Sequence, residues 1–391
     1  DLSSQCLAIN KDNIAICRDM YKNLIITYNQ TTKEWKFISS KDIVDGIKGN
    51  HNFTEHDFNY ARIVCYDKSD RLWAFIDGLD KETDIRYIIS ISQDSTQIHS
   101  QVYNTEQNKF YNIRGVYDLK VDPKGDLWAI INHFCPLNDT TAFYYYSLCK
   151  YKDSCFVTVN NLTYSDNGYE VKKNIAFDNL GRVWHSNIDT LYLIENEKVI
   201  KKISTYEFPK GCNKISEVVV NSKNVVYLLN YGITLYKLDG EERSSFDYIW
   251  EIEKYINYNS NKTNYYMCID SSDNVWILGP THNLYKLDSA DNWTVYRVPN
   301  QDTTKLNPYR INIEADQEGK IWIVDNTYGI NIFNPNGVVS VENQQTNEIR
   351  GIADVWIRKL YPNPAIQNVT LEFFLENAVR NECKICMYNT I

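Results

Sequence analysis

Short runs in which hydrophobic and polar residues alternate recur along most of the chain. Alternation with a period of two residues is typical of strands that bury one face, and polar or glycine-containing turns separate these runs. One group of four runs reads "VYDLKVD" (116–122), "LWAII" (127–131), "FYYYSLCKY" (143–151) and "CFVTV" (155–159). The order of four returns near the end in "RINIEAD", "IWIVD", "GINIF" and "VVSVE" (310–342), and it opens the chain in "CLAIN", "NIAIC", "LIITYN" and "EWKFIS" (6–39). The pattern predicts an all-β protein built from repeated four-stranded units.

A seven-residue phrase joins the first two runs of each unit. It begins with Asp or Asn, has Gly, Asn or Asp in fourth place, and ends on an aromatic residue in six of its seven copies. The copies are NKDNIAI (10–16), DKSDRLW (67–73), DPKGDLW (122–128), DNLGRVW (178–184), NSKNVVY (221–227), DSSDNVW (270–276) and DQEGKIW (316–322).

The residue types in this phrase have physical causes. An Asp or Asn side chain at the start of a type I turn accepts backbone N–H groups from the residues that follow it. The fourth residue must adopt a left-handed conformation to enter the next strand, which Gly, Asn and Asp do at low cost. The seventh residue then lies on the returning strand, where a large ring can fill the gap to a neighbouring sheet.

The spacing of the copies predicts the architecture. They begin at residues 10, 67, 122, 178, 221, 270 and 316, and units of about 50 residues with four strands each are typical of a β-propeller. We therefore expect a seven-bladed β-propeller over residues 1–350, because a closed ring leaves no long sheet edge exposed. The aromatic residues of the phrase are expected to pack between blades rather than to bind a ligand: Trp73, Trp128, Trp184, Tyr227, Trp276 and Trp322.

The amino-acid sequence of the repeat also resembles that of a known family. "DQEGKIWIVDNTYGINIFNPNG" (316–337) is similar to the two-component-regulator propeller repeat, in which Asp, Gly, Trp and a final aromatic residue stand at these intervals. The copies that end on Ile16 and Tyr227 depart from the family pattern, where Trp stands. The resemblance covers roughly residues 5–345 and implies the fold more strongly than the function, because propellers serve many functions.

The periodicity changes after Ile352. The segment 361–365 reads "YPNPA", and this phrase resembles the start of a type IX secretion sorting domain, a small β-sandwich; Tyr361, Pro362, Asn363 and Pro364 carry the match. The resemblance implies that residues 351–391 are the N-terminal part of a β-sandwich, and that a Bacteroidetes-type bacterium exports the protein to its surface or medium. A generic immunoglobulin-like module is the alternative. The chain begins at Asp1 without a signal peptide, which favours a mature form or an excised segment.

Composition excludes some classes of function. The 391 residues include 30 Tyr, 14 Phe and 9 Trp but only 3 Met, which favours strands. The net charge of −9 argues against binding to nucleic acid or to an anionic membrane, since both need a basic face. The sequence has no apolar run long enough for a membrane-spanning helix.

Ten cysteines in a chain of this length do not indicate a disulfide framework. Cys149 and Cys155 flank an expected hairpin and either face each other and bond or stay reduced. Cys383 and Cys386 form a CxxC, but strand geometry would point the two side chains to opposite faces.

The sequence shows no catalytic motif such as a nucleophile elbow, a Walker loop or HExxH. His51 and His56 have a spacing that suits neither a helix face nor a strand face, so we predict no metal site there. The acidic loop around Asp77, Asp80, Glu82 and Asp84 fits no EF-hand, so a solvated loop is expected rather than a structural calcium site. We therefore expect no cofactor.

Ligands of propellers usually bind on loops around one mouth of the central channel. The long loops expected on that face are residues 40–60, 77–85, 132–142 and 158–170, which places the candidate surface over the first three blades. The candidate ligand contacts are His51, His56, Asp80, His133, Asp139, His185, Tyr231, His282 and Tyr328.

Three functions remain open from the sequence. The first is a non-enzymatic, secreted or cell-surface propeller that recognises a glycan or a protein; its C-terminal segment would contact outer-membrane components of type IX secretion, and it could belong to the surface attachment complex of that system. The second is the periplasmic sensor ectodomain of a hybrid two-component regulator. The third is a propeller lyase, which would need a histidine and metal-binding carboxylates at the channel mouth.

Overall fold

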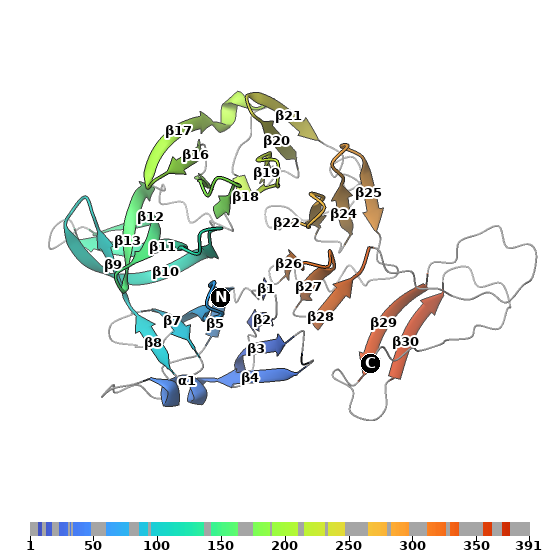
Figure 1. Ribbon diagram of the computed structural model, residues 1–391, viewed down its shortest axis with the longest axis horizontal. Coiled ribbons are helices and arrows are strands. Elements are labelled where there is room, and N and C mark those ends of the chain that lie inside the picture. The colour runs from blue at the N-terminus through green and yellow to red at the C-terminus, as the bar shows by residue number, and fades with distance from the viewer. Residues whose placement is uncertain are drawn as a thin grey trace, which may run out of the picture.

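A computed structural model describes the protein over residues 7–9, 13–17, 23–29, 32, 34–47, 60–77, 86–92, 95–136, 142–162, 175–187, 190–209, 215–230, 234–246, 265–279, 283–296, 311–325, 329–335, 355–361 and 370–375. Almost every described element is a strand. Figure 1 shows successive sheets arranged in a ring, with β1, β5, β18, β22 and β26 near the centre.

Five of the sheets have four strands in simple sequential order, rather than the seven that the repeat predicts. Their strands are β1 (Leu7–Ile9), β2 (Asn13–Cys17), β3 (Asn23–Asn29) and β4 (Trp35–Ser39); β5 (Tyr60–Tyr66), β6 (Leu72–Asp77), β7 (Tyr87–Ile91) and β8 (Thr96–His99); β14 (Ile175–Phe177), β15 (Val183–Ser186), β16 (Thr190–Glu195) and β17 (Lys198–Ser204); β18 (Ile215–Val220), β19 (Val226–Asn230), β20 (Leu235–Asp239) and β21 (Glu242–Phe246); β22 (Tyr266–Ile269), β23 (Val275–Leu278), β24 (Leu284–Leu287) and β25 (Trp293–Tyr296).

Two further sheets depart from that form. The strands β9 (Gln101–Asn104), β10 (Lys109–Val121), β11 (Leu127–Pro136), β12 (Ala142–Lys152) and β13 (Cys155–Leu162) close into a five-stranded barrel, because β9 pairs with both β10 and β13. The sheet of β26 (Ile311–Ala315), β27 (Ile321–Asp325) and β28 (Gly329–Phe333) has three strands, and the expected fourth strand at 338–342 lies outside the described residues.

The described part of the tail is a two-stranded antiparallel sheet of β29 (Val355–Tyr361) and β30 (Thr370–Leu375). Two strands do not make the predicted β-sandwich, so that part of the fold prediction is not confirmed. Pro362, Asn363 and Pro364 lie outside the described residues.

Within the described residues two short helices interrupt the strands, and one of them differs from the prediction. Residues expected to begin the long loop 40–60 instead form helix α1 (Ser40–Gly46), whose capping box joins Ser39 and Asp42, and whose Ile43 is buried in the core between the first two sheets. The capping hydrogen bonds from Ser39 lower the pKa of Asp42. The 3₁₀ helix η2 (Thr205–Glu207) follows β17.

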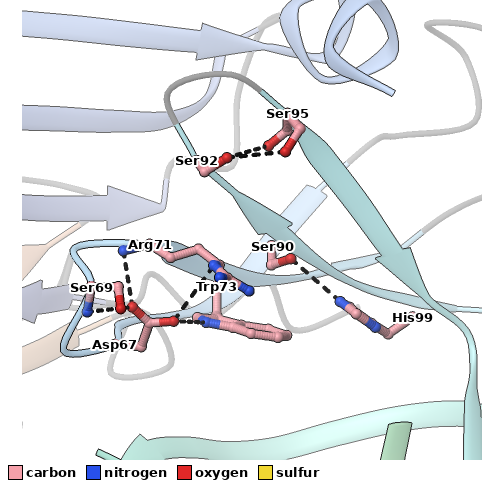
Figure 2. A network of polar contacts seen from close by, with 8 residues as sticks. All are labelled: Asp67, Ser69, Arg71, Trp73, Ser90, Ser92, Ser95 and His99. Atoms are coloured by element: carbon pink, nitrogen blue, oxygen red, sulfur yellow. Dashed lines mark hydrogen bonds and ion pairs between the residues drawn. The ribbon is translucent and has the colours of Figure 1, made fainter. Parts of the chain in front are cut away.

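The repeated turn adopts the conformation that its residues predict. The fourth residue has a positive φ angle in each described copy, from 56° at Asp70 to 96° at Gly125. In the first of these copies Asp67 Oδ1 accepts the backbone N–H groups of Ser69 and Arg71 at 2.9 and 3.0 Å, and Asp67 Oδ2 accepts the indole N–H of Trp73 at 2.9 Å (Figure 2). One carboxylate therefore fixes both the turn and the ring that packs between sheets.

The same bond from the indole to the first Asp of the phrase recurs in three other copies. The distances from Nε1 to Oδ2 are 3.1 Å for Trp128 and Asp122, 2.7 Å for Trp276 and Asp270, and 2.9 Å for Trp322 and Asp316. Trp184 differs because Arg182 Nε donates to Asp178 Oδ2 at 2.7 Å in place of the indole. No acceptor among the described residues bonds Trp184 Nε1. All the phrase aromatics from Trp73 onward are at most 6% exposed.

Neighbouring turns also touch each other. Where the fourth residue is Gly125 or Gly181, the stem of Lys68 or Lys124 from the preceding turn lies against it. Where the fourth residue is polar, its side chain accepts a hydrogen bond from the preceding turn instead of contacting a lysine side chain. Asn179 N–H donates to Asn224 Oδ1 at 2.8 Å, and Ser222 N–H donates to Asp273 Oδ1 at 2.7 Å. The fourth residue of each of these turns is thus matched to the turn before it.

We expect Gly125→Ala to lower the free energy of unfolding by about 1 to 2 kcal/mol, because alanine is strained at this φ angle. Its Cβ would also lie 2.5 Å from Lys68 Cδ. Gly319→Asn is the matched control, since the site has space and Asn224 adopts the same conformation elsewhere in the ring. Urea titrations of both variants measure the difference, and an equal loss in both would contradict the role given to Lys68.

Candidate functional site

A cavity of about 390 Å³ lies among the strands that precede five consecutive repeated turns, β10, β14, β18, β22 and β26. These strands surround the centre of the ring in Figure 1. The lining residues come from the ends of the strands that precede the repeated turns, so the cavity lies toward the turn face of the ring. They are Lys120, Val121, Asp122, Pro123, Ala176, Phe177, Glu217, Val218, Val219, Val220, Met267, Cys268, Ile269 and Glu314.

Charged side chains of the first strands hold adjacent sheets together beside this cavity. Asp118 Oδ2 accepts the backbone N–H of Ile175 at 2.9 Å, and Lys120 Nζ donates to the backbone carbonyl of the same residue at 2.7 Å. Both backbone groups at one edge position of β14 are thereby paired with β10, which matters because buried unpaired edge groups are costly.

A second contact of this kind joins β18 to β22. The carboxylate of Glu217, which is 1% exposed, accepts the backbone N–H of Met267. Asp122 at the cavity wall is engaged by Trp128, as described above. Several of the polar groups around the cavity thus make hydrogen bonds that hold the protein's own strands together. The cavity therefore resembles a structural channel with a polar wall more than a reaction centre.

The pair His133 and Ser147 is the described arrangement most similar to a nucleophile with its base. His133 Nε2 lies 3.0 Å from Ser147 Oγ, and Ser147 Oγ donates to Asn161 Oδ1 at 2.7 Å. Because the serine proton points to Asn161, His133 must donate to Ser147 rather than accept its proton. Both side chains are 0% exposed, and burial lowers the pKa of His133 to about 4, so the pair holds β11, β12 and β13 together instead of activating a nucleophile.

His133 and His185 were predicted as ligand contacts on loops, and the structure places both inside the sheets. His185 is 0% exposed on β15, and its ring stacks near that of Tyr192 with a centroid distance of 6.2 Å. The long loops expected at 132–142 and 158–170 begin later than predicted, because β11 continues to Pro136 and β13 to Leu162; residues 137–141 and 163–170 lie outside the described residues. The other candidate contacts lie outside the described residues: His51, His56, Asp80, Asp139, Tyr231, His282 and Tyr328.

Cys149 and Cys155 do not form a disulfide. Both are free, because the register pairs Cys149 with Thr158 and Cys155 with Lys152 across the hairpin. Burial raises the pKa of Cys149 well above its usual value, so this thiol stays protonated. Within the described ranges, no group of three or more His, Cys, Asp or Glu side chains could hold a metal ion, and no helix is long and apolar enough to span a membrane.

Two features of the structure were not predicted from the sequence. The first is the set of polar residues in first strands, for which the signal is an acidic residue four positions before the Asp or Asn of the turn phrase, as at Asp118 and Glu217. The second is the additional hairpin of β9 and β10, which the stretch "QVYNTEQNKFYN" (101–112) encodes as two alternating runs around a polar turn.

No protein-family model matches the chain, and no curated protein matches it in sequence. Among solved structures, the WD40 β-propeller domain of Doa1 is similar over 86% of this chain and 94% of that chain, with 12% sequence identity and a TM-score of 0.51. The fold is a β-propeller.

Two further similar structures have lower scores. The extracellular domain of a protein assigned as a hybrid two-component system from B. thetaiotaomicron has 15% identity over 94% of this chain, which spans 55% of that chain, with a TM-score of 0.35. A gluconolactonase from Xanthomonas campestris has 11% identity over 71% of this chain and 84% of that one, with a TM-score of 0.41. The fold alone does not select a function, because propellers serve many functions.

Proposed function

We propose that this propeller is a non-enzymatic recognition protein that binds a glycan or a protein partner. The observation that supports this proposal most directly is the engagement of reactive side chains in the fold. The Ser147 hydroxyl donates a hydrogen bond to Asn161 Oδ1, and Asp118 and Lys120 bind backbone groups of Ile175. A protein in which such side chains make hydrogen bonds within the fold is better suited to binding a ligand than to catalysing a reaction.

We also propose that the protein is exported to the cell surface or the medium by type IX secretion, with residues 351–391 as the signal and outer-membrane secretion components as partners. The "YPNPA" phrase at 361–365 supports this part of the proposal. A place in the surface attachment complex of that system is the more specific form. Deletion of 351–391 in a bacterium that has this system is expected to retain the protein inside the cell, and unchanged export would contradict the proposal.

Two other functions are weaker candidates. A sensor ectodomain of a hybrid two-component regulator is favoured by the repeat in 316–337, which resembles the repeat of those proteins. A lyase would need a histidine beside metal-binding carboxylates, and the described part of the chain has no such cluster.

Binding without turnover is the result expected for the intact chain. A glycan array and a proteome pull-down measure binding, while mass spectrometry of each retained glycan, and of gluconolactone as a test substrate, measures turnover. Ligands should be recovered chemically unchanged. Release of a cleaved glycan, or opening of the lactone above the buffer rate, would contradict the proposal and favour an enzyme.

A further inference from the structure

The hairpin of β9 and β10 lies on the outer perimeter of the ring, at the left of Figure 1. Its register places Phe110 directly opposite Tyr103, and Asn112 directly opposite Gln101. Because side chains alternate between the faces of a strand, these four residues share one face of the hairpin. We call this set, together with Asn108, the aromatic–amide face.

The opposite face of the hairpin anchors it to the barrel. Val102 is 0% exposed and pairs in parallel with Phe156 of β13, while the ring of Tyr111 stacks on His133 with a centroid distance of 5.5 Å. Burial of these side chains supplies the stability of the hairpin. The aromatic–amide face is therefore not needed to attach the hairpin to the ring.

The turn of the hairpin is fixed by side-chain hydrogen bonds. Asn104 is 1% exposed, and its Oδ1 accepts the backbone N–H groups of Glu106 and Gln107 at 3.0 and 3.1 Å. Thr105 N–H donates to Thr158 Oγ1 at 3.0 Å, and Thr105 Oγ1 donates to the carbonyl of Thr158 at 3.2 Å. A surface held in this way loses little conformational entropy when it binds a ligand.

The aromatic–amide face exposes rings where a soluble strand usually exposes polar groups. Phe110 is 55% exposed, and its ring lies 5.0 Å from that of Tyr103, between centroids. Tyr103 Oη donates to Asn108 Oδ1, and Gln101 Nε2 donates to Asn112 Oδ1 at 3.4 Å. Each amide uses one polar atom in these contacts, and its other polar atom can bond a ligand.

The geometry points to this face as a binding site for a neutral carbohydrate. The apolar C–H face of a sugar ring can pack on the aromatic pair through dispersion and weak C–H contacts, and amides can both donate to and accept from its hydroxyls. None of the five residues is charged, which suits a neutral ligand. The inference rests on the proposed recognition function and gives it a ligand class and a surface.

The size of the face favours a sugar over a protein. The exposed parts of the two rings amount to roughly 200 Å², given that a whole aromatic side chain buries 150–250 Å². A stable protein interface needs about 800 Å² from each partner. The charged residues of the hairpin, Glu106 and Lys109, lie in or next to the turn rather than on the face itself.

Titration of the full chain with hexasaccharides of β-glucan, α-glucan, xylan and mannan, followed by calorimetry, tests the inference. We expect binding of at least one of them, a loss of affinity of at least ten-fold in Phe110→Ala, and retention within three-fold in Phe110→Trp. Phe37→Ala removes another exposed aromatic ring, 48% exposed on β4, and should leave affinity unchanged. Urea titration checks that each variant is folded.

The other outcomes separate this inference from the proposed function. Equal affinity in Phe110→Ala would overturn the site while leaving recognition intact. Absence of binding to all four hexasaccharides would overturn the carbohydrate inference, and the glycan array and pull-down described above would then decide whether recognition itself fails. A change of oligomeric state in Phe110→Ala, measured by sedimentation, would show that the face binds a second copy and would also overturn the inference.

Discussion

Replacing Asp270 with alanine is expected to lower the free energy of unfolding by at least about 3 kcal/mol, because several buried donors would lose their shared acceptor. Asp270 Oδ1 accepts the backbone N–H groups of Ser272 and Asn274 at 2.9 and 3.0 Å, and Asp270 Oδ2 accepts Trp276 Nε1 at 2.7 Å. The side chain of Asn274 also donates to this carboxylate at 2.8 Å. Urea titration followed by tryptophan fluorescence measures the loss.

A pair of tryptophan variants isolates the indole bond within this network. Trp276→Phe and Trp184→Phe remove similar volume from buried sites, but only Trp276 donates to its Asp. We expect Trp276→Phe to be the more destabilising of the two by about 1 to 3 kcal/mol, since it leaves a buried carboxylate with one fewer donor. Equal losses would show that ring packing alone, without the bond, accounts for the tryptophan at this position.

Acid is expected to destabilise the protein from about pH 6.5 down to 4, a loss that begins above the range in which carboxylates are protonated. Burial lowers the pKa of both His99 and His133 to about 4, against about 6.5 in an unfolded chain. The unfolded state therefore binds more protons in this range, and stability is present above pH 6.5 and lost as the pH falls toward 4. Each histidine, at 8% or less exposure, contributes on the order of 3 kcal/mol.

His99 has the clearer environment for a test. Its ring stacks on Trp73 with a centroid distance of 5.1 Å and meets Tyr151 edge-on, while Nε2 lies 3.3 Å from Ser90 Oγ (Figure 2). His99→Phe keeps an aromatic ring there and removes the titration. The slope of unfolding free energy against pH, measured near pH 5.3, should fall by about 1.4 kcal/mol per pH unit. An unchanged slope would contradict the assignment of a lowered pKa to His99.

The turn phrase could be interpreted well from sequence because its constraints are local. The positive φ angles at Asp70, Gly125 and Asp273 follow from residue type within a seven-residue window. The bond from the phrase's Asp to its Trp was not predicted, although both residues were singled out, because it depends on how the carboxylate and the indole turn toward each other across the hairpin. The Trp184 exception was not predictable from residue type either, because Arg71 stands in the same fifth place as Arg182 and Trp73 still bonds Asp67.

Blade number and the positions of two candidate histidines were predicted less well, because they depend on distant pairing. The count of seven four-stranded blades assumed that each phrase stands for one regular sheet, whereas β9 pairs with both β10 and β13 and closes a barrel. The histidines His133 and His185 were placed on loops because strand ends are difficult to locate in sequence. The residue that bonds His133 is Ser147, which lies on the next strand, and the alternation pattern does not indicate such a pairing.

The turn-to-turn contacts restrict how such a protein can be rearranged. Lys68 lies over Gly125, whereas Ser222 bonds Asp273, so each corner is shaped by the repeat that comes before it. Transplanting one unit to another place in the ring would replace these matched pairs with others, for example a lysine stem in place of the serine that bonds Asp273. The interchangeable module of this protein, for duplication or for engineering, is therefore the junction between two repeats rather than the single repeat.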